Sequence, residues 1–197
     1  MPKIGMAPKR QEQIIRAAID TIHVDGLSQT SFREIGRRAN VSPSLITHYF
    51  GNRDALYVEV LAYLNRRTAS AILVSLKAAR SPRERLVGIA LANFDPEHFE
   101  PATASAWFAL WGMLPEISEL KRFQSIYERR LRSNVIYAMR PLIPPPDLNL
   151  AVELFIATLD GLWVKAAQPT SPLDSKGALE AMVRFIDILL CHFPARD

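Results

Sequence analysis

The sequence predicts an all-α protein, with a small three-helix head in residues 1–52 and a larger helical domain in residues 53–197. Apolar residues recur at helical spacing along nearly the whole chain. Ser, Asn and Pro stand where helices begin, and no stretch shows the alternation typical of a strand. With 197 residues, of which 49% are hydrophobic, the chain can bury a full core.

The first predicted helix covers residues 8–24 and ends at a glycine. Gly26 follows the last apolar residue and suits a C-terminal stop. The residues that repeat at helical spacing, and so form the buried face, are Ile14, Ile15, Ala18, Ile19 and Ile22.

Two short helices separated by a tight turn follow in residues 31–50. Ser31 caps the first, and Glu34 completes the spacing of a capping box. Asn40 tolerates the turn, Ser42 offers a second cap, and Pro43 takes the first position of the second helix. The residues expected to form the small shared core are Ile35, Ala39, Val41, Ile46 and Tyr49. This is the spacing of a helix-turn-helix, whose second helix enters the DNA major groove.

The remaining elements are also helical. Asn52 or Asp54 opens a long helix reaching about Ala79, and Ser81 opens another reaching about Asn93. After a loop at 94–101, helices are expected at 103–114 and 116–139. A proline-rich connector precedes helices 148–168 and 176–193, which we expect to pair with the same helices of a second chain in a homodimer.

The positive charge is concentrated in the head. Residues 1–53 hold eight Lys and Arg against four Asp and Glu, which accounts for the whole formal net charge of +4. A localised excess of this kind is either a solvated face or a surface for a polyanion. Because it coincides with the helix-turn-helix, we expect double-stranded DNA as the partner.

Composition also excludes several classes of protein. The single cysteine, Cys191, rules out an internal disulfide framework, and no signal peptide or membrane span is apparent. We therefore expect a cytoplasmic, nucleoid-associated protein. Cys191 beside His192 does not make a catalytic pair, because adjacent helical residues point in different directions. We expect no enzyme activity, no cofactor and no metal site.

The candidate DNA contacts lie on and around the second helix of the motif. Outward residues such as Thr47 and His48 suit base edges, and Tyr49 suits phosphate. The full set is Thr30, Arg33, Ser42, Ser44, Leu45, Thr47, His48, Tyr49, Asn52 and Arg53. Arg37 and Arg38 can add contacts, or simply be solvated.

The head resembles the TetR family of bacterial transcription repressors. The resemblance covers roughly residues 8–60 and rests on Thr30, Ser31, Ile35, Ala39, Val41, Ser42, Ile46, Tyr49, Phe50 and Leu56. Further segments, including THYFGNRDAL, NFDPEHF, AWFALWGM and DGLWVKAA, resemble the family's BetI group of choline-sensing repressors of glycine betaine synthesis. Gly51 and the proline-rich connector depart from the usual pattern. The resemblance implies a homodimer on a palindromic operator, released from DNA by an effector bound in the C-terminal domain.

The candidate effector residues are aromatic, with one acid. A quaternary ammonium is best held by aromatic faces and a carboxylate, and the residues that offer these are Phe94, Trp107, Trp111, Asp160 and Trp163. The alternatives are core packing for the tryptophans and an ion pair, with Lys165 or an arginine, for Asp160. The leading hypothesis is a choline-responsive repressor of choline and glycine betaine genes. The alternatives are a helical small-molecule-binding protein or enzyme with an incidental basic head, and a TetR-type regulator of an unrelated effector.

Overall fold

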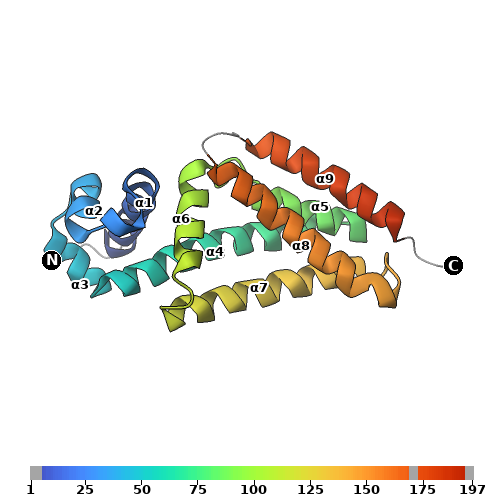
Figure 1. Cartoon of the computed structure of the whole chain (residues 1–197), viewed down its shortest axis with the longest axis horizontal. Coiled ribbons are helices and arrows are strands. Elements are labelled where there is room, and N and C mark those ends of the chain that lie inside the picture. Colours follow the sequence, from blue (N-terminus) through green and yellow to red (C-terminus); the bar gives the residue numbers. More distant parts are fainter. Residues whose placement is uncertain (1–5, 169–172, 194–197) are drawn as a thin grey trace. The chain divides into compact units, whose positions relative to one another are not determined.

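The computed structural model describes residues 6–168 and 173–193, and these residues form helices and turns without a strand (Figure 1). The predicted fold class is confirmed. The elements are α1 Met6–Asp25, the 3-10 helix η1 Leu27–Gln29, α2 Phe32–Ala39, α3 Pro43–Phe50, α4 Arg53–Ala78, α5 Pro82–Asn93, α6 Pro101–Gly112, α7 Ser118–Met139, α8 Pro145–Ala167 and α9 Ser175–His192. None of the described helices is long and apolar enough to span a membrane.

The chain divides into two compact units. Unit 1 comprises residues 1–65 and 105–124, and unit 2 comprises residues 66–104 and 125–197. Helices α4, α6 and α7 each contribute residues to both units.

Unit 1 is built around the three-helix head. Its core includes Ile14 and Ala18 of α1, Ile35 and Ala39 of α2, Ile46 and Phe50 of α3, and Leu56 and Val60 of α4, all at most 8% exposed. Val41 and Tyr49, which we expected in this core, are only partly buried. Phe50 is buried beside Ile46 because residues four apart lie on the same face of a helix.

The helix caps follow the sequence signals closely. Ser31 Oγ accepts a hydrogen bond from Glu34 N at 3.2 Å, and Ser42 Oγ accepts one from Leu45 N at 3.3 Å. Asn52 Oδ1 accepts one from Ala55 N at 2.8 Å and so caps α4. Ser81 caps α5 in the same way, through Glu84 N at 3.1 Å. Each cap satisfies a backbone donor that the helix itself cannot.

Unit 2 packs α5, α8 and α9 together with parts of α4 and α7, and α9 packs against both α5 and α8 (Figure 1). Its core includes Leu86 and Ile89 of α5, Val135 of α7, Phe155 and Leu159 of α8, and Met182 and Ile186 of α9, all at most 2% exposed. The proline-rich connector is shorter than expected. Pro145 and Pro146 belong to the first turn of α8, where their missing N–H groups cost nothing.

Candidate nucleic-acid interface

Helix α3 presents one face to the core and the other to solvent. Ile46 and Phe50 are buried, whereas Ser44, Thr47 and His48 are exposed and Leu45 is partly exposed. The exposed side chains are short and polar or aromatic, the types that read base edges in a major groove. The outward face of α3 is therefore open to a duplex.

The turn between α2 and α3 depends on a close backbone approach at Gly36. Asn40 adopts the left-handed conformation, with φ of 49°, and Val41 N donates to the Gly36 carbonyl at 2.9 Å. A Cβ at Gly36 would lie only 2.7 Å from the Val41 carbonyl oxygen. Glycine at position 36 therefore permits the turn, a requirement that our sequence analysis missed.

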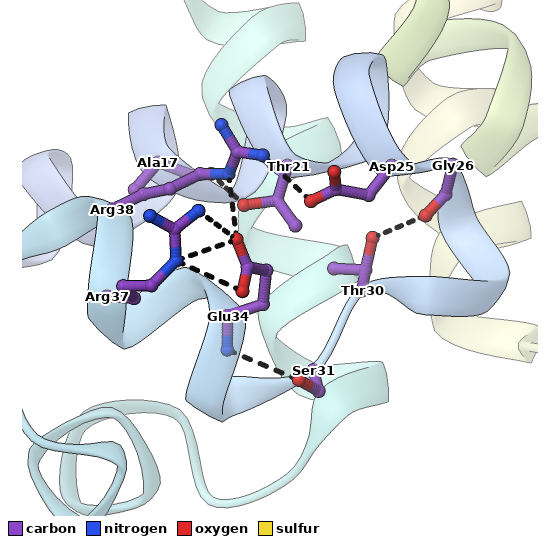
Figure 2. Close-up of polar contacts among 9 residues, drawn as sticks. All are labelled: Ala17, Thr21, Asp25, Gly26, Thr30, Ser31, Glu34, Arg37 and Arg38. Atoms are coloured by element: carbon purple, nitrogen blue, oxygen red, sulfur yellow. Dashed lines mark hydrogen bonds and ion pairs between the residues drawn. The ribbon is translucent and has the colours of Figure 1, made fainter.

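Two of the three arginines on α2 are engaged within the head (Figure 2). Arg38 Nη2 donates to Asp25 Oδ2 at 2.8 Å, and its Nε lies 3.5 Å from Glu34 Oε1. Arg37 Nη2 donates to the same Glu34 carboxylate at 2.5 Å. This hydrogen bond holds the pKa of Glu34 below its ordinary value. The Glu34 carboxylate thus holds both arginines. Of the expected capping box, the structure shows the half in which Glu34 N donates to Ser31 Oγ.

Arg33 differs from its neighbours on α2. Its side chain is exposed, and it forms no ion pair with any described residue. A solvated guanidinium of this kind can meet a phosphate without first breaking a bond inside the protein.

Several other candidate contacts are already hydrogen-bonded. Thr30 is fully buried and its hydroxyl donates to the Gly26 carbonyl at 2.9 Å, so the residue offers no surface to a duplex (Figure 2). Ser42 and Asn52 are exposed, but each also caps a helix.

Two further candidates make ring contacts. Tyr49 packs edge-on against His48, with ring centroids 5.5 Å apart. Arg53 is exposed, and its guanidinium lies 5.8 Å from the centroid of the Tyr57 ring.

The candidate effector residues are divided between the two units. Trp107 and Trp111 belong to unit 1. Trp107 is 5% exposed, and Trp111 packs edge-on against Phe108 with ring centroids 5.1 Å apart.

In unit 2, Phe94 and Trp163 both pack edge-on against a third ring, Phe99. The centroid of Phe99 lies 5.1 Å from that of Phe94 and 4.7 Å from that of Trp163, and each of the three side chains is at most 6% exposed. Sequence reasoning missed Phe99, although it falls within the NFDPEHF segment.

Asp160 lies one helical turn before Trp163 on α8. Burial, with a smaller contribution from the charge of Glu128, raises the pKa of Asp160 to about 6. No ion pair links this carboxylate to Lys165 or to any other described residue. A carboxylate that is largely buried without a cation is costly to ionise, and a bound cation would remove that cost.

A cluster that sequence reasoning did not single out lies after α5. The ligand atoms of Asp95, Glu97 and His98 all lie within 4.8 Å of one another, close enough for a metal ion. However, Arg67 Nε donates to His98 Nε2 at 2.9 Å, and Arg67 also pairs with Glu97 at 3.8 Å. Because a guanidinium already holds two of the three ligands, we interpret the cluster as a polar network around Arg67.

Comparison with known protein families gives two matches on this chain. Residues 14–60 match the family described as bacterial regulatory proteins, tetR family. Residues 82–190 match the BetI-type transcriptional repressor, C-terminal family.

Individual proteins are similar over almost the whole chain. An HTH-type transcriptional regulator BetI of Agrobacterium fabrum (strain C58 / ATCC 33970) is 34% identical, with 98% of this chain and 94% of that protein covered. The protein of the same name from Brucella abortus (strain 2308) is 34% identical over 100% of both chains. Among solved structures, a putative transcriptional regulator from Pseudomonas aeruginosa PAO1 superposes with a TM-score of 0.79 at 25% identity, covering 94% of this chain and 92% of that one.

Proposed function

The chain belongs to the TetR family of bacterial regulatory proteins, with a BetI-type C-terminal domain, and we propose that it represses transcription by binding a palindromic operator as a homodimer that a choline-like cation releases. The family relationship makes it a DNA-binding transcriptional regulator and not an enzyme, and the relatives described above are named as transcriptional regulators. The operator contacts, the dimer face and the effector are the proposed parts.

The observation that supports the DNA contacts is the two-sided packing of α3. Ile46 and Phe50 hold the helix on the head, while Ser44, Thr47 and His48 remain exposed for base edges. We assign phosphate contacts to Arg33, Tyr49 and Arg53, and leave Thr30 out because it is buried. Ser42, Leu45 and Asn52 complete the proposed interface.

The dimer face is supported by an apolar stripe on α8. Leu150, Leu154 and Val164 are 54%, 39% and 41% exposed. Ala157 and Gly161 continue the same stripe, and a Cβ at Gly161 would meet nothing within 4 Å. On α9, Ile188 is 66% exposed. Exposed apolar rows with small residues between them favour close packing of a second helix, which here would give a four-helix interface.

The effector proposal rests on Asp160 and its aromatic neighbours. A quaternary ammonium forms no conventional hydrogen bond, so it is recognised by ring faces and by an unpaired carboxylate. Asp160 supplies the charge, and Trp163 and Phe94 supply rings in the same unit. Trp107 and Trp111 belong to unit 1 and stay separate candidates, outside the group proposed here.

The DNA-binding proposal is tested by replacing Thr47, His48 and Tyr49 together with alanine. Fluorescence anisotropy with labelled operator DNA, selected from a random library by the wild-type protein, measures affinity. The triple variant should lose specific binding while remaining a dimer by light scattering. Unchanged operator affinity would reject α3 as the recognition helix.

A further inference from the structure

Three arginines gather around a hollow in unit 2 that none of the functions above uses. The hollow has a volume of about 450 Å³ and is lined by Ala79, Arg80, Ser81, Pro82, Arg85, Tyr137, Arg140 and Pro141. This volume falls within the range of small-molecule sites. No acidic residue is among those that line it.

Arg85 is the central residue of this arginine pocket. Its guanidinium carbon lies 4.7 Å from the centroid of the Tyr137 ring, a cation–π contact that fixes where the charge lies. The Arg85 Nε atom is buried and has no hydrogen-bond partner in the part of the chain that the structure describes. A buried donor without an acceptor is unfavourable, and a bound oxyanion would supply the acceptor.

Arg80 and Arg140 add charge at the rim of the pocket. Both are exposed, and neither they nor Arg85 form an ion pair with any described carboxylate. The nearest acid along the chain, Glu84, accepts a hydrogen bond from the backbone N–H of Arg80 at 2.7 Å. Arg80 and Arg140 each follow the C-terminal end of a helix, where the helix dipole favours a positive charge. The dipole does not account for Arg85, which lies inside α5 and faces the same hollow.

We propose that the pocket lined by Arg80, Arg85 and Arg140 binds a small, multiply charged oxyanion, either a phosphorylated or a polycarboxylic metabolite. Guanidinium groups present planar N–H forks that match phosphate and carboxylate oxygens alike, so the shared chemistry is a compact group with two or more negative charges. The site is separate from the proposed cation effector, because its charge has the opposite sign.

The test is isothermal titration calorimetry on the full-length protein with pyrophosphate and with citrate, at constant ionic strength in sodium chloride. We expect saturable binding of at least one of the two. The ion with the lower Kd identifies the phosphoryl or the carboxylate class. The absence of saturable binding by both ions would overturn the proposal.

Matched variants separate a built site from general positive charge. Arg85→Gln should weaken binding at least about tenfold, as expected for the loss of one charge-assisted hydrogen bond. Arg83→Gln removes the same charge from the same helix, but Arg83 pairs with Asp187 at 2.7 Å and does not line the pocket. Its Kd should stay within about twofold of wild type, since exposed charges are screened by salt. Equal losses in the two variants, or an unchanged Kd for Arg85→Gln, would overturn the proposal.

A replacement variant and a measurement of operator affinity complete the test. If Arg85→Gln fails to fold, the double variant Arg80→Gln with Arg140→Gln replaces it, because both side chains are exposed, and it should also weaken binding at least about tenfold. Operator affinity should be unchanged in whichever variant is used. A parallel loss of DNA binding would assign the arginines to the nucleic acid and overturn the small-ligand proposal.

Discussion

Arg38 on α2 donates a hydrogen bond to Asp25, the last residue of α1, with 2.8 Å between Nη2 and Oδ2 (Figure 2). Both side chains are less than one-third exposed. The ion pair therefore joins two of the three helices of the head at a site where solvent screens it only partly.

Replacing Arg38 with alanine should destabilise the head. We expect a loss of about 1–2 kcal/mol in the free energy of unfolding, because Asp25 would be left partly buried without its cation. Urea denaturation followed by circular dichroism measures the change. Arg37→Ala is the matched control, since Arg37 is 69% exposed and its pair with Glu34 contributes little. Equal effects of the two changes would contradict the structural role of Arg38.

Gly36→Ala should distort the turn that positions α3. The added Cβ would meet the Val41 carbonyl oxygen at 2.7 Å, and a backbone atom cannot move aside as a flexible side chain can. We expect a destabilisation of about 1–3 kcal/mol and weaker operator binding. Gly112→Ala, which places its Cβ in open space, should leave stability equal or slightly higher. Thermal unfolding of both variants measures the difference, and a stable Gly36→Ala protein would argue against the close approach.

Charge on the exposed stripe of α8 should separate the proposed dimer. Leu154→Lys combined with Ile188→Lys would place two like charges from each chain inside the four-helix interface, where burial and mutual repulsion disfavour them. Light scattering should report a monomer at micromolar concentration. Leu73→Lys changes an exposed leucine on α4, 57% accessible against 39% for Leu154, and should remain dimeric. A dimeric double variant would place the interface elsewhere.

The free energy of unfolding should depend on pH through Asp160. Its pKa of about 6 in the folded protein exceeds the ordinary value of 3.8, so the folded state binds the proton more tightly than the unfolded state. This contribution to stability is present below pH 4 and is lost as pH rises to about 6. Asp160→Asn should therefore gain on the order of 2 kcal/mol over wild type above pH 7, and little near pH 4. Urea denaturation across this range measures it, and a gain independent of pH would assign the effect to another group.

Binding of the proposed effector should also depend on pH through Asp160. Choline should raise the melting temperature at pH 7.5 more than at pH 5, because Asp160 must be ionised to attract the cation. Betaine aldehyde should behave similarly, whereas the neutral carbon isostere of choline should have little effect. Equal stabilisation by the isostere would contradict recognition through charge and aromatic faces.

Features that depend on neighbouring residues were predicted well from the sequence. The caps at Ser31, Ser42 and Ser81, and Pro43 at the start of α3, are all confirmed. These signals are local, because a side chain satisfies a backbone donor two or three residues away.

Features that depend on tertiary packing were predicted less well. The requirement for glycine at position 36 comes from the Val41 carbonyl across the turn, and the contact of Phe99 with Trp163 joins residues far apart in the chain. The pairing of Arg38 with Asp25 likewise removes a candidate phosphate ligand that sequence spacing could not distinguish from Arg33. The assignments of the DNA-binding and effector residues themselves stay predictions.

The connection between α3 and α4 consists of Gly51 and Asn52 alone. Asn52 is also held by its cap on α4, so little of this connection is free to change conformation. A tilt or rotation of α4 would therefore be transmitted directly to α3, the proposed recognition helix. Extra glycines inserted after Asn52 would make this connection flexible. We expect operator binding to persist and the response to the proposed effector to be lost.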